Sequence, residues 1–407
     1  MSQWAHPAGS KHGPLAGIRV LDLSRVLAGP YCSMLLGDLG AEVIKIERPG
    51  SGDDTRHWGP PFRNGESAYF ICCNRNKKSV TLDLKTEIGR RLVRDLLRKS
   101  DVLVENFLPG KLAACGLDYQ SVRVLNQSLV YCSITGFGQT GPRRLEPGYD
   151  LLVQAMSGVM SITGEPGRQP MKVGVAIADI TAGLFASNAI MAALVGRATS
   201  GRGDYIDIAL YDACLAWLAN VGSAYLMTGE LPARYGNAHP SIVPYQAFDA
   251  LDAAFVVAVG NDRQYQRFCD AIGRPELGAD ARFSSNAARV RNREVLIGQL
   301  GEHFRAAEAA FWLEALARAR VPCGPINTLD RALADPQVAA RGMQVEVAHA
   351  RCDSLSMVAS PIKLASTGST QGVSPPPLLG EHTEQILKSV LDLSDAEVAQ
   401  LARDGIT

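Results

Sequence analysis

Hydrophobic and polar positions alternate along the first half of the chain so that short apolar runs and amphipathic segments follow one another. The runs predict strands at 17–23, 41–47, 79–84, 101–105, 129–134 and 204–209. The segments with a helical period lie at 30–39, 86–98, 149–160, 180–197 and 211–226. Strands that alternate with helices predict a mostly parallel sheet covered by helices on both faces.

The pattern changes near residues 228–245, which are richer in Gly, Pro and His. Strands are predicted at 245–249, 255–259, 343–348 and 357–364, and helices at 263–272, 291–306, 309–319, 383–392 and 394–404. The sequence therefore predicts an α/β protein with a large doubly wound, Rossmann-like domain and a smaller α+β lobe. We expect the large domain over 14–205, the small domain over 228–325 and a segment over 335–407 that returns to the large domain.

Composition excludes several classes of function. The chain has 407 residues and a formal net charge of zero, from 41 basic and 41 acidic side chains, which argues against a nucleic-acid or membrane-surface partner. Its apolar runs fall short of the roughly 18–20 residues of a membrane span. Residues 1–13 have the pattern of neither a signal peptide nor a transit peptide, so we expect a cytoplasmic protein.

The cysteines and histidines predict neither disulfides nor a metal site. The nine cysteines are odd in number, scattered and without a Cys-x-x-Cys pair, which is typical of reduced thiols in a cytosol-like compartment. The seven histidines do not cluster at the spacing of metal ligands.

The stretch Met171–Gly183 carries the most chemistry. Val173, Val175 and Ile177 alternate with small residues and predict a strand that leads into the helix. Asp179 stands where the pattern changes, and two interpretations remain open. Its carboxylate can cap the helix, or it can serve as a nucleophile that small neighbours leave accessible to an acyl group.

Two glycine-rich loops follow predicted strands. Residues 48–56 form a charged loop of the kind that holds ligands at the carboxyl ends of parallel strands. Residues 136–141 spell Gly-x-Gly-x-x-Gly, but Pro142 and a polar run follow where a dinucleotide site needs a helix. A nicotinamide or flavin site is therefore not expected.

The bounds of the first helix are also predicted. Gly29-Pro30 predicts that the helix begins with a proline in the N1 position, and Gly40 predicts where the helix ends.

Several motifs together resemble the class III coenzyme A-transferases, the family of the formyl-CoA and carnitine CoA-transferase type. They are Leu15–Leu23, Leu39–Asp53, Val104–Phe107, the stretch around Asp179, Val321–Pro325 and Leu378–Thr383. The resemblance covers residues 14–383. Further runs, at 52–56, 58–61, 74–78, 131–136 and 239–248, are similar to the dicarboxylate branch, whose members take CoA from succinyl-CoA to acids such as glutarate.

This resemblance implies a covalent mechanism at Asp179, through an aspartyl anhydride and then an aspartyl-CoA thioester. It implies that Arg48 pairs with a CoA phosphate. It also implies that the CoA path is lined by Leu82, Lys85, Asn106, Phe107, Thr135, Gly136 and Phe137. Acyl-CoA and small carboxylic acids are then substrates, with no permanently bound cofactor. Members of the family form interlocked homodimers, with the active site between the large domain and the small lobe of the partner.

The sequence departs from the formyl-transferring members at two positions. Leu27 replaces a glutamine near the end of the first strand, which argues against a formyl or oxalyl substrate. Ala114 replaces a CoA-contacting arginine, so this CoA contact is either missing or supplied by another residue, for which Lys111 is the candidate. We include Leu27, Tyr149 and His239 as candidate residues of the substrate pocket. Lys85 can instead be a solvated strand end, and His239 a loop residue with a backbone partner.

Two other functions remain as alternatives. A 2-methylacyl-CoA racemase of the same fold pairs the aspartate with a histidine in the run Gly148–Asp150, where this chain has Tyr149, whose ordinary pKa suits that proton transfer poorly. A non-catalytic CoA-binding protein would keep Arg48 without needing a nucleophile at Asp179.

Overall fold

The computed structural model describes residues 13–365 and 372–407, so nearly all of the predicted N-terminal tail lies outside the described residues. The chain divides into two compact units. The first contains residues 1–159, 173–227 and 336–407, and the second contains residues 160–172 and 228–335.

The first unit is built on a six-stranded parallel sheet, as predicted. Its strands are β1 (Arg19–Asp22), β2 (Glu42–Glu47), β5 (Lys77–Thr81), β6 (Val102–Glu105), β7 (Val130–Thr135) and β8 (Tyr205–Ala209). Their order across the sheet is β5-β2-β1-β6-β7-β8, so the chain winds outward from β1 first in one direction and then in the other. This doubly wound order brings the ends of β1 and β6 together at the switch point, where ligands bind in such sheets.

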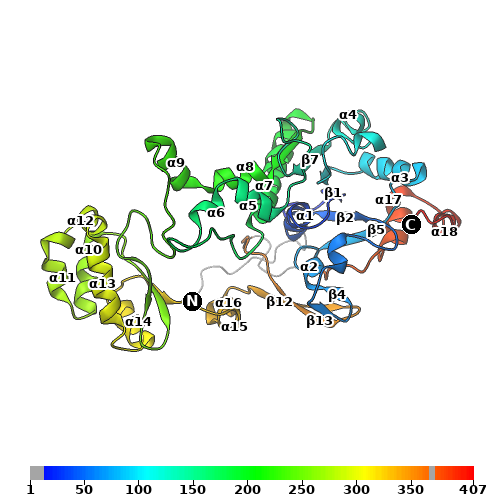
Figure 1. Ribbon diagram of the computed structural model, residues 1–407. Helices are drawn as coiled ribbons and strands as arrows, with labels where there is room; N and C mark the ends of the chain where they lie inside the picture. Colours follow the sequence, from blue (N-terminus) through cyan, green and yellow to red (C-terminus); the bar gives the residue numbers. More distant parts are fainter. Residues whose placement is uncertain (1–12, 366–371) are drawn as a thin grey trace. The chain divides into compact units, whose positions relative to one another are not determined.

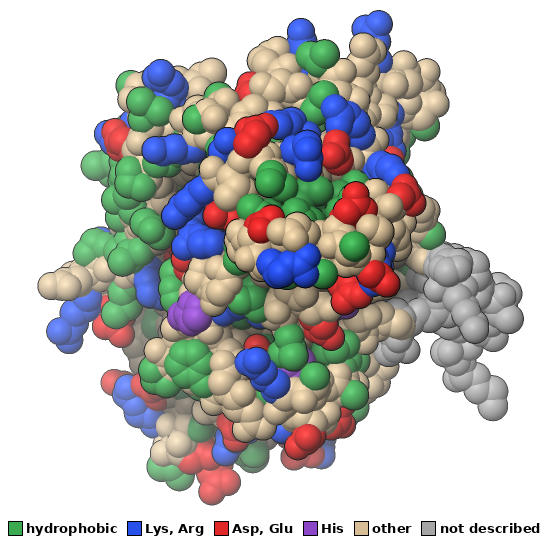
Figure 2. Space-filling view, turned by 90° about the vertical axis from the view of Figure 1, so that its right-hand side faces the viewer, with side chains coloured by type: hydrophobic (Ala, Val, Ile, Leu, Met, Phe, Trp, Pro, Cys, Tyr) green, Lys and Arg blue, Asp and Glu red, His purple; other side chains and the backbone are tan. Residues whose placement is uncertain are grey.

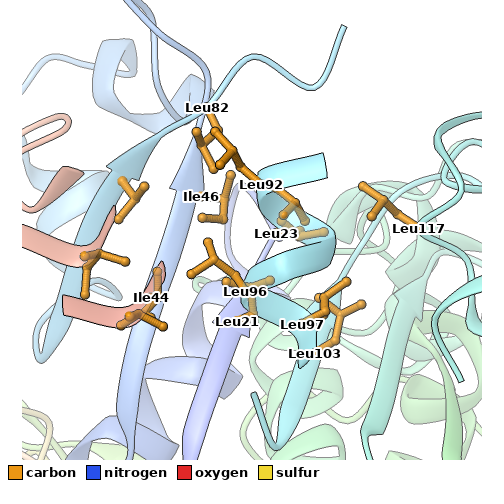
Figure 3. Close-up of a cluster of buried hydrophobic side chains, with 14 of the residues drawn as sticks. Leu21, Leu23, Ile44, Ile46, Leu82, Leu92, Leu96, Leu97, Leu103 and Leu117 are labelled. Atoms are coloured by element: carbon orange, nitrogen blue, oxygen red, sulfur yellow. The ribbon is translucent and has the colours of Figure 1, made fainter. Parts of the chain in front are cut away.

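Neighbouring residues of a strand pack into two separate hydrophobic cores, because side chains alternate between the faces of a sheet. Leu21, Ile44 and Leu103 point to one face and pack against Leu92 and Leu96 of α3 (Figure 3). The residues one position earlier, Val20, Val43 and Val102, point to the other face, into a core that also contains α1 and α7 residues.

Each face carries its own set of helices (Figure 1). One face holds α3 (Glu87–Arg98), α4 (Tyr119–Val122), α17 (Thr383–Leu391) and α18 (Asp395–Arg403). The other holds α1 (Ala28–Asp38), α5 (Asp150–Met156), α7 (Ile177–Ser200) and α8 (Leu210–Trp217). Smaller elements are η1 (Asp54–His57), β3 (Phe62–Arg63), β4 (Glu66–Ser67), α2 (Ala68–Ile71), η2 (Ala113–Cys115), α16 (Pro336–Ala340), β12 (Gln344–His349) and β13 (Asp353–Val358).

The C-terminal segment closes the sheet edge at β5. The His382 N–H donates to the carbonyl oxygen of Ser79 at 2.9 Å, and the Thr383 hydroxyl accepts the Thr81 N–H at 3.0 Å. Further along, the Asp83 N–H donates to the carbonyl oxygen of Ile406 at 2.8 Å. The chain after β5 is therefore fixed by residues some 300 positions away in sequence.

The second unit has a three-stranded sheet in the order β11-β10-β9, packed against helices by a core rich in aromatic residues. Its elements are β9 (Tyr245–Asp249), β10 (Ala254–Ala258), α10 (Asp262–Ala271), α11 (Pro275–Ala279), η3 (Ala281–Phe283), α12 (Asn286–Arg291), α13 (Arg293–Phe304), α14 (Ala309–Arg318), β11 (Cys323–Pro325) and α15 (Leu329–Leu333). Two short helices, α6 (Val159–Ile162) and α9 (Ala219–Thr228), lie where the chain passes between the units.

Several local predictions were wrong. The predicted helix at 211–226 is two helices, because Ala219, where the second helix begins, has a left-handed φ of 43°. The second strand of the late hairpin is Asp353–Val358, earlier than the predicted 357–364. Pro30 is the third residue of α1 instead of its first. The glycine-rich loop at 136–141 is followed by a helix only at Asp150, which confirms that it lacks the geometry of a dinucleotide site.

Helix α7 also corrects the statement on apolar runs. The helix has 24 residues and contains an 18-residue window with a mean hydropathy of 1.5, so by length and composition it passes the test for a membrane-crossing helix. It packs against α1, α5, α8, β7 and β8, and 33% of its apolar window is buried within the single chain. Figure 2 shows a face of the molecule where Lys and Arg side chains are interspersed with Asp and Glu.

Candidate active site

A cleft of about 820 Å³ opens in the first unit where the strands of the parallel sheet end. Its walls come from the segments that follow β1, β2, β5, β6 and β7, the position that the fold predicts for a ligand. The cleft brings together nine of the residues singled out in the sequence, which are Arg48, Leu82, Lys85, Asn106, Phe107, Thr135, Gly136, Tyr149 and Asp179.

Three of the candidate residues do not contribute to this wall among the described residues. Leu27 is buried in the N-cap position of α1, and Phe137 turns to the Tyr211 ring, at a centroid distance of 5.8 Å. His239 belongs to the second unit, where its Nδ1 accepts the Ser241 N–H at 3.0 Å. This hydrogen bond to the backbone is the one expected if His239 is a loop residue, the alternative to a role in the substrate pocket.

Asp179 does not cap its helix, because α7 begins two residues before it, at Ile177. The predicted strand at 173–177 is also absent, and the segment approaches the helix as irregular backbone. The helix end is satisfied by another residue, since the Ala178 N–H donates to Oδ1 of Asp150 at 2.8 Å. Asp150 thus satisfies a free N–H of this first turn, and the Asp179 carboxylate lies in the cleft wall.

The surroundings of Asp179 hold its proton more tightly than water does. Burial raises the pKa of the carboxyl to about 7, and the neighbouring charge of Asp150 acts in the same direction. The hydrogen bond from the Ala28 N–H opposes this rise. A partly desolvated carboxylate with few hydrogen bonds is a better nucleophile than a solvated one, and a pKa near 7 leaves about half of the molecules ionised in neutral solution.

Helix α7, which carries Asp179, packs closely on α1 at Ala28. A Cβ atom added to Gly183 would lie 2.7 Å from the carbonyl oxygen of Ala28, so only glycine allows the two helices to approach this closely. Ala182 and Ala186, on the same helix, are fully buried. The small residues near Asp179 therefore bring the first turns of two helices together.

Three cations line the cleft without an ion-pair partner among the described residues. They are Arg48, at the end of β2, and the exposed side chains of Lys85 and Lys111. Ala114 lies on the same wall as Lys111. The cleft therefore offers uncompensated positive charge to a phosphorylated ligand.

The sequence analysis missed five residues that build this site: Arg25, Val26, Lys45, Asp53 and Asp150. Lys45 is 0% exposed, and its Nζ donates to Asp53 Oδ2 at 2.9 Å. A lysine between Ile44 and Ile46 in a buried strand was a signal that could have found it. The other four carry no such signal, because their roles depend on contacts that form only in the fold.

Comparison with known proteins agrees with this geometry. A family model described as CoA-transferase family III matches residues 15–383. The chain belongs to this family. Succinyl-CoA:glutarate CoA-transferase from Mus musculus is 44% identical over 97% of this chain and 90% of its own length. Succinate–glutarate CoA-transferase from Agrobacterium fabrum is 48% identical over 92% of this chain and 95% of its own length.

Two solved structures of similar proteins have the same fold as this CoA-transferase. A CAIB/BAIF family protein from Brucella suis matches with a TM-score of 0.83 and 45% identity, over 93% of this chain and 100% of that one. A Mycobacterium tuberculosis protein matches with a TM-score of 0.81 and 31% identity, over 91% and 98%. The predicted family and the α/β fold with its parallel sheet are confirmed.

Residues 13–365 and 372–407 contain no group of three or more His, Cys, Asp or Glu side chains that could hold a metal ion.

Gly136→Ala is expected to reduce kcat/KM of this CoA-transferase about 100-fold, because a displacement of about 1 Å at a catalytic site has an effect of that size. The new Cβ would lie 2.5 Å from the Cα of Gly148, and backbone cannot move aside as a side chain does. The segment that carries Tyr149 and Asp150 would shift. Gly298→Ala, where nothing lies within 4 Å, is the matched control, and unchanged kinetics for Gly136→Ala would contradict the prediction.

Proposed function

We propose that this transferase moves CoA from succinyl-CoA to glutarate or a closely related dicarboxylate, with Asp179 as the nucleophile. The observation that carries the proposal is the Asp179 carboxylate itself, which lies in the cleft wall, has a raised pKa and takes no part in capping α7. The names of two relatives, at 44% and 48% identity, support the choice of acids.

The proposed reaction passes the acyl group and then CoA through Asp179. The carboxylate attacks the thioester carbonyl, the C–S bond breaks, and a mixed anhydride forms as CoA thiolate leaves. The thiolate attacks the aspartyl carbonyl and releases succinate, which leaves an aspartyl-CoA thioester. The acceptor carboxylate then attacks this thioester to form a second anhydride, and the thiolate attacks the acceptor's carbonyl to give the new acyl-CoA and free Asp179.

A carboxylate suits this exchange because both of its derivatives remain activated acyl groups, so the energy of the thioester is retained. The exchange requires that water be kept from the anhydride. It also requires hydrogen-bond donors where negative charge develops on oxygen. The Ala28 N–H, at the start of the helix that packs against α7, is proposed as one such donor.

The CoA moiety is proposed to lie along the cleft from Asp179 to Arg48. Arg48, Lys85 and Lys111 face the phosphates, with Lys111 in place of the arginine that other members have at the position of Ala114. Leu82, Phe107 and the turn at Thr135-Gly136 line the pantetheine path. Arg48 suits a phosphate because its planar group is always charged and donates two parallel hydrogen bonds.

A homodimer, interlocked as in related enzymes, is part of the proposal. Large apolar side chains are exposed on the first unit of the single chain, among them Leu184, Phe185, Trp217, Leu226 and Met227. Exposed apolar surface of this kind marks an interface, and sedimentation of the purified protein as a dimer is the expected result. The nine cysteines are free thiols, which supports a cytoplasmic location.

The pH dependence is expected to report the Asp179 carboxyl. Because the nucleophile must be ionised and its pKa is raised to about 7, kcat/KM should rise with pH and reach half its plateau near pH 7. Asp150→Asn removes a like charge, which lowers the pKa of Asp179, so the rising limb should move to lower pH. A limb at the same pH in both proteins would contradict this assignment.

The function is tested by incubating the protein with succinyl-CoA and a panel of glutarate, itaconate, malate, mesaconate and oxalate, with mass detection of the acyl-CoA formed. Glutaryl-CoA should form fastest. Hydroxylamine added during turnover should convert Asp179 to a hydroxamate that peptide mapping locates. Exchange of the α-hydrogen of 2-methylacyl-CoA in deuterated water without free acid would favour the racemase, and bound CoA without any adduct would favour a binding protein.

A further inference from the structure

Val26, between β1 and α1, has a backbone conformation that its side chain disfavours. Its φ is +70°, in the left-handed region that glycine occupies freely and that a β-branched residue almost never adopts. Val26 lines the same cleft as Asp179. Strain of this kind persists only where the surrounding structure enforces it, and it concentrates at functional sites.

Side chains from two other segments hold the turn at Val26 in this conformation. Asn106, after β6, binds the backbone of Arg25 on both sides: its Oδ1 accepts the Arg25 N–H at 2.9 Å, and its Nδ2 donates to the Arg25 carbonyl at 2.6 Å. Asp53 accepts the N–H of Val26 itself through Oδ1 at 3.2 Å. Both amide atoms of Asn106 are thus committed to the turn.

Asp53 belongs to the loop at 48–54, which also contains Arg48, and hydrogen bonds hold Asp53 in place there. Its N–H donates to Oε2 of Glu47 at 2.9 Å, and its Oδ2 accepts the Lys45 ammonium at 2.9 Å. The Lys45 Nζ also donates to the carbonyl of Ser24 at 2.8 Å, one step before the turn. Gly52 has a φ of +68°, and a Cβ there would lie 2.8 Å from both Oε2 of Glu47 and Cδ of Arg56, so the loop fits closely over these two side chains.

The C-terminal end of the turn at Val26 leads into helix α1, which packs against the helix of Asp179. Helix α1 begins at Ala28, two residues after Val26, and Ala28 packs against Gly183 of the helix that carries Asp179 and lines the same cleft. A chain of hydrogen bonds, adjoining backbone and helix packing therefore runs from the loop of Arg48 through Asp53 and Val26 to the helix that carries Asp179. Every link in it lines the cleft.

We propose that Asp53 and Val26 are positioning residues that use the binding of the nucleotide end of CoA to align Asp179 and the Ala28 N–H for reaction. This rests on the proposed transferase function. Phosphates bound at Arg48 and its neighbours fix the loop, the loop fixes Asp53, and Asp53 holds the strained turn. Binding energy from a part of the substrate that does not react is thereby realised as a higher kcat.

The test compares succinyl-CoA with succinylpantetheine, which has the same thioester but lacks the nucleotide. In the wild-type enzyme, kcat should be about 100-fold higher with succinyl-CoA, the size of effect that accurate positioning has on a reaction. In Asp53→Asn and in Val26→Gly the ratio should fall below about tenfold, since kcat for succinyl-CoA drops while kcat for succinylpantetheine stays nearly constant. KM for succinyl-CoA should change less than about threefold, because the contacts to the phosphates remain.

The two variants differ in how strongly they are expected to destabilise the fold. The proposal can therefore be tested with Val26→Gly even if Asp53→Asn does not fold. Asp53→Asn leaves the buried Lys45 without its carboxylate, whereas Val26→Gly places the residue best suited to a positive φ at the turn. Asp38→Asn breaks another buried ion pair, with Arg75 at 2.5 Å, away from the turn, and should keep the wild-type ratio.

Each outcome of the comparison has one meaning. An equal loss of kcat for both thioesters in Val26→Gly, or no loss for either, would overturn the positioning role. Lack of CoA transfer by the wild-type enzyme with any acid of the panel would overturn the proposed function, and this inference with it.

Discussion

Asp179→Asn is expected to lose about 10⁴–10⁶-fold in kcat for CoA transfer, the size of effect seen when a covalent nucleophile is removed. The amide retains the shape of the side chain but cannot attack the thioester carbonyl, so no anhydride forms. The measurement is the initial rate of glutaryl-CoA formation from succinyl-CoA. CoA affinity, measured by calorimetry, should change little, because the cations that face the phosphates lie elsewhere in the cleft.

The same substitution should stabilise the fold in alkaline solution. The folded-state pKa of Asp179 is raised to about 7, so the folded protein binds this proton more tightly than the unfolded chain does. Its contribution to stability is fully present below the unfolded pKa, near 4, and is lost as the pH rises through about 7. Asp179→Asn should therefore melt higher than the wild-type protein at pH 8 and with a smaller difference at pH 4. Retained transfer activity would refute the nucleophile, and a lower melting temperature at pH 8 would refute the assigned electrostatics.

Lys45→Met is expected to lower the free energy of unfolding by about 3–5 kcal/mol, the usual cost of removing one partner from a buried ion pair. Lys45 and Asp53 are both 0% exposed at their side chains. Burial alone would lower the pKa of Lys45, but the charges of Asp53, Asp22 and Glu47 raise it, so the ammonium stays charged. Methionine fills the space and leaves the Asp53 carboxylate without its cation.

Lys85→Met provides the control for this measurement. Lys85 lines the same cleft but is exposed and has no ion-pair partner among the described residues, so its loss should change stability by less than about 0.5 kcal/mol. Its effect should instead be a higher KM for succinyl-CoA. Urea unfolding with a constant slope distinguishes the two lysines, and equal midpoints for both variants would show that the buried pair is not a major source of stability.

The alternation of apolar runs predicted the parallel sheet because buried strands and amphipathic helices each leave a periodic signal. The same logic placed the cleft at the strand ends, and Arg48, Asn106 and Asp179 do lie on its wall. Periodicity failed where tertiary contacts override local preference. Val173 and Val175 alternate like a strand, yet that segment is irregular backbone, and the Val173 N–H donates to Oε1 of Gln154.

The helix cap could not be predicted either. Asp179 and Asp150 are both aspartates near a predicted helix start, and only the fold shows that Asp150 bonds the first turn of α7 from another helix. Val26 is the extreme case. Nothing in its sequence neighbourhood indicates a left-handed backbone, because the conformation is imposed by Asp53 and Asn106 from other strands.

The contact between β5 and the C-terminal segment has a consequence for how this protein is made. Strand β5 and Asp83 emerge early in translation, but the groups that they bond, in residues 382–406, are synthesised roughly 300 codons later. Throughout that interval the edge of the nascent sheet remains unshielded and prone to pair with other extended chains. The Leu82–Lys85 part of the cleft wall, which lies on the proposed CoA path, is therefore completed only after those residues leave the ribosome.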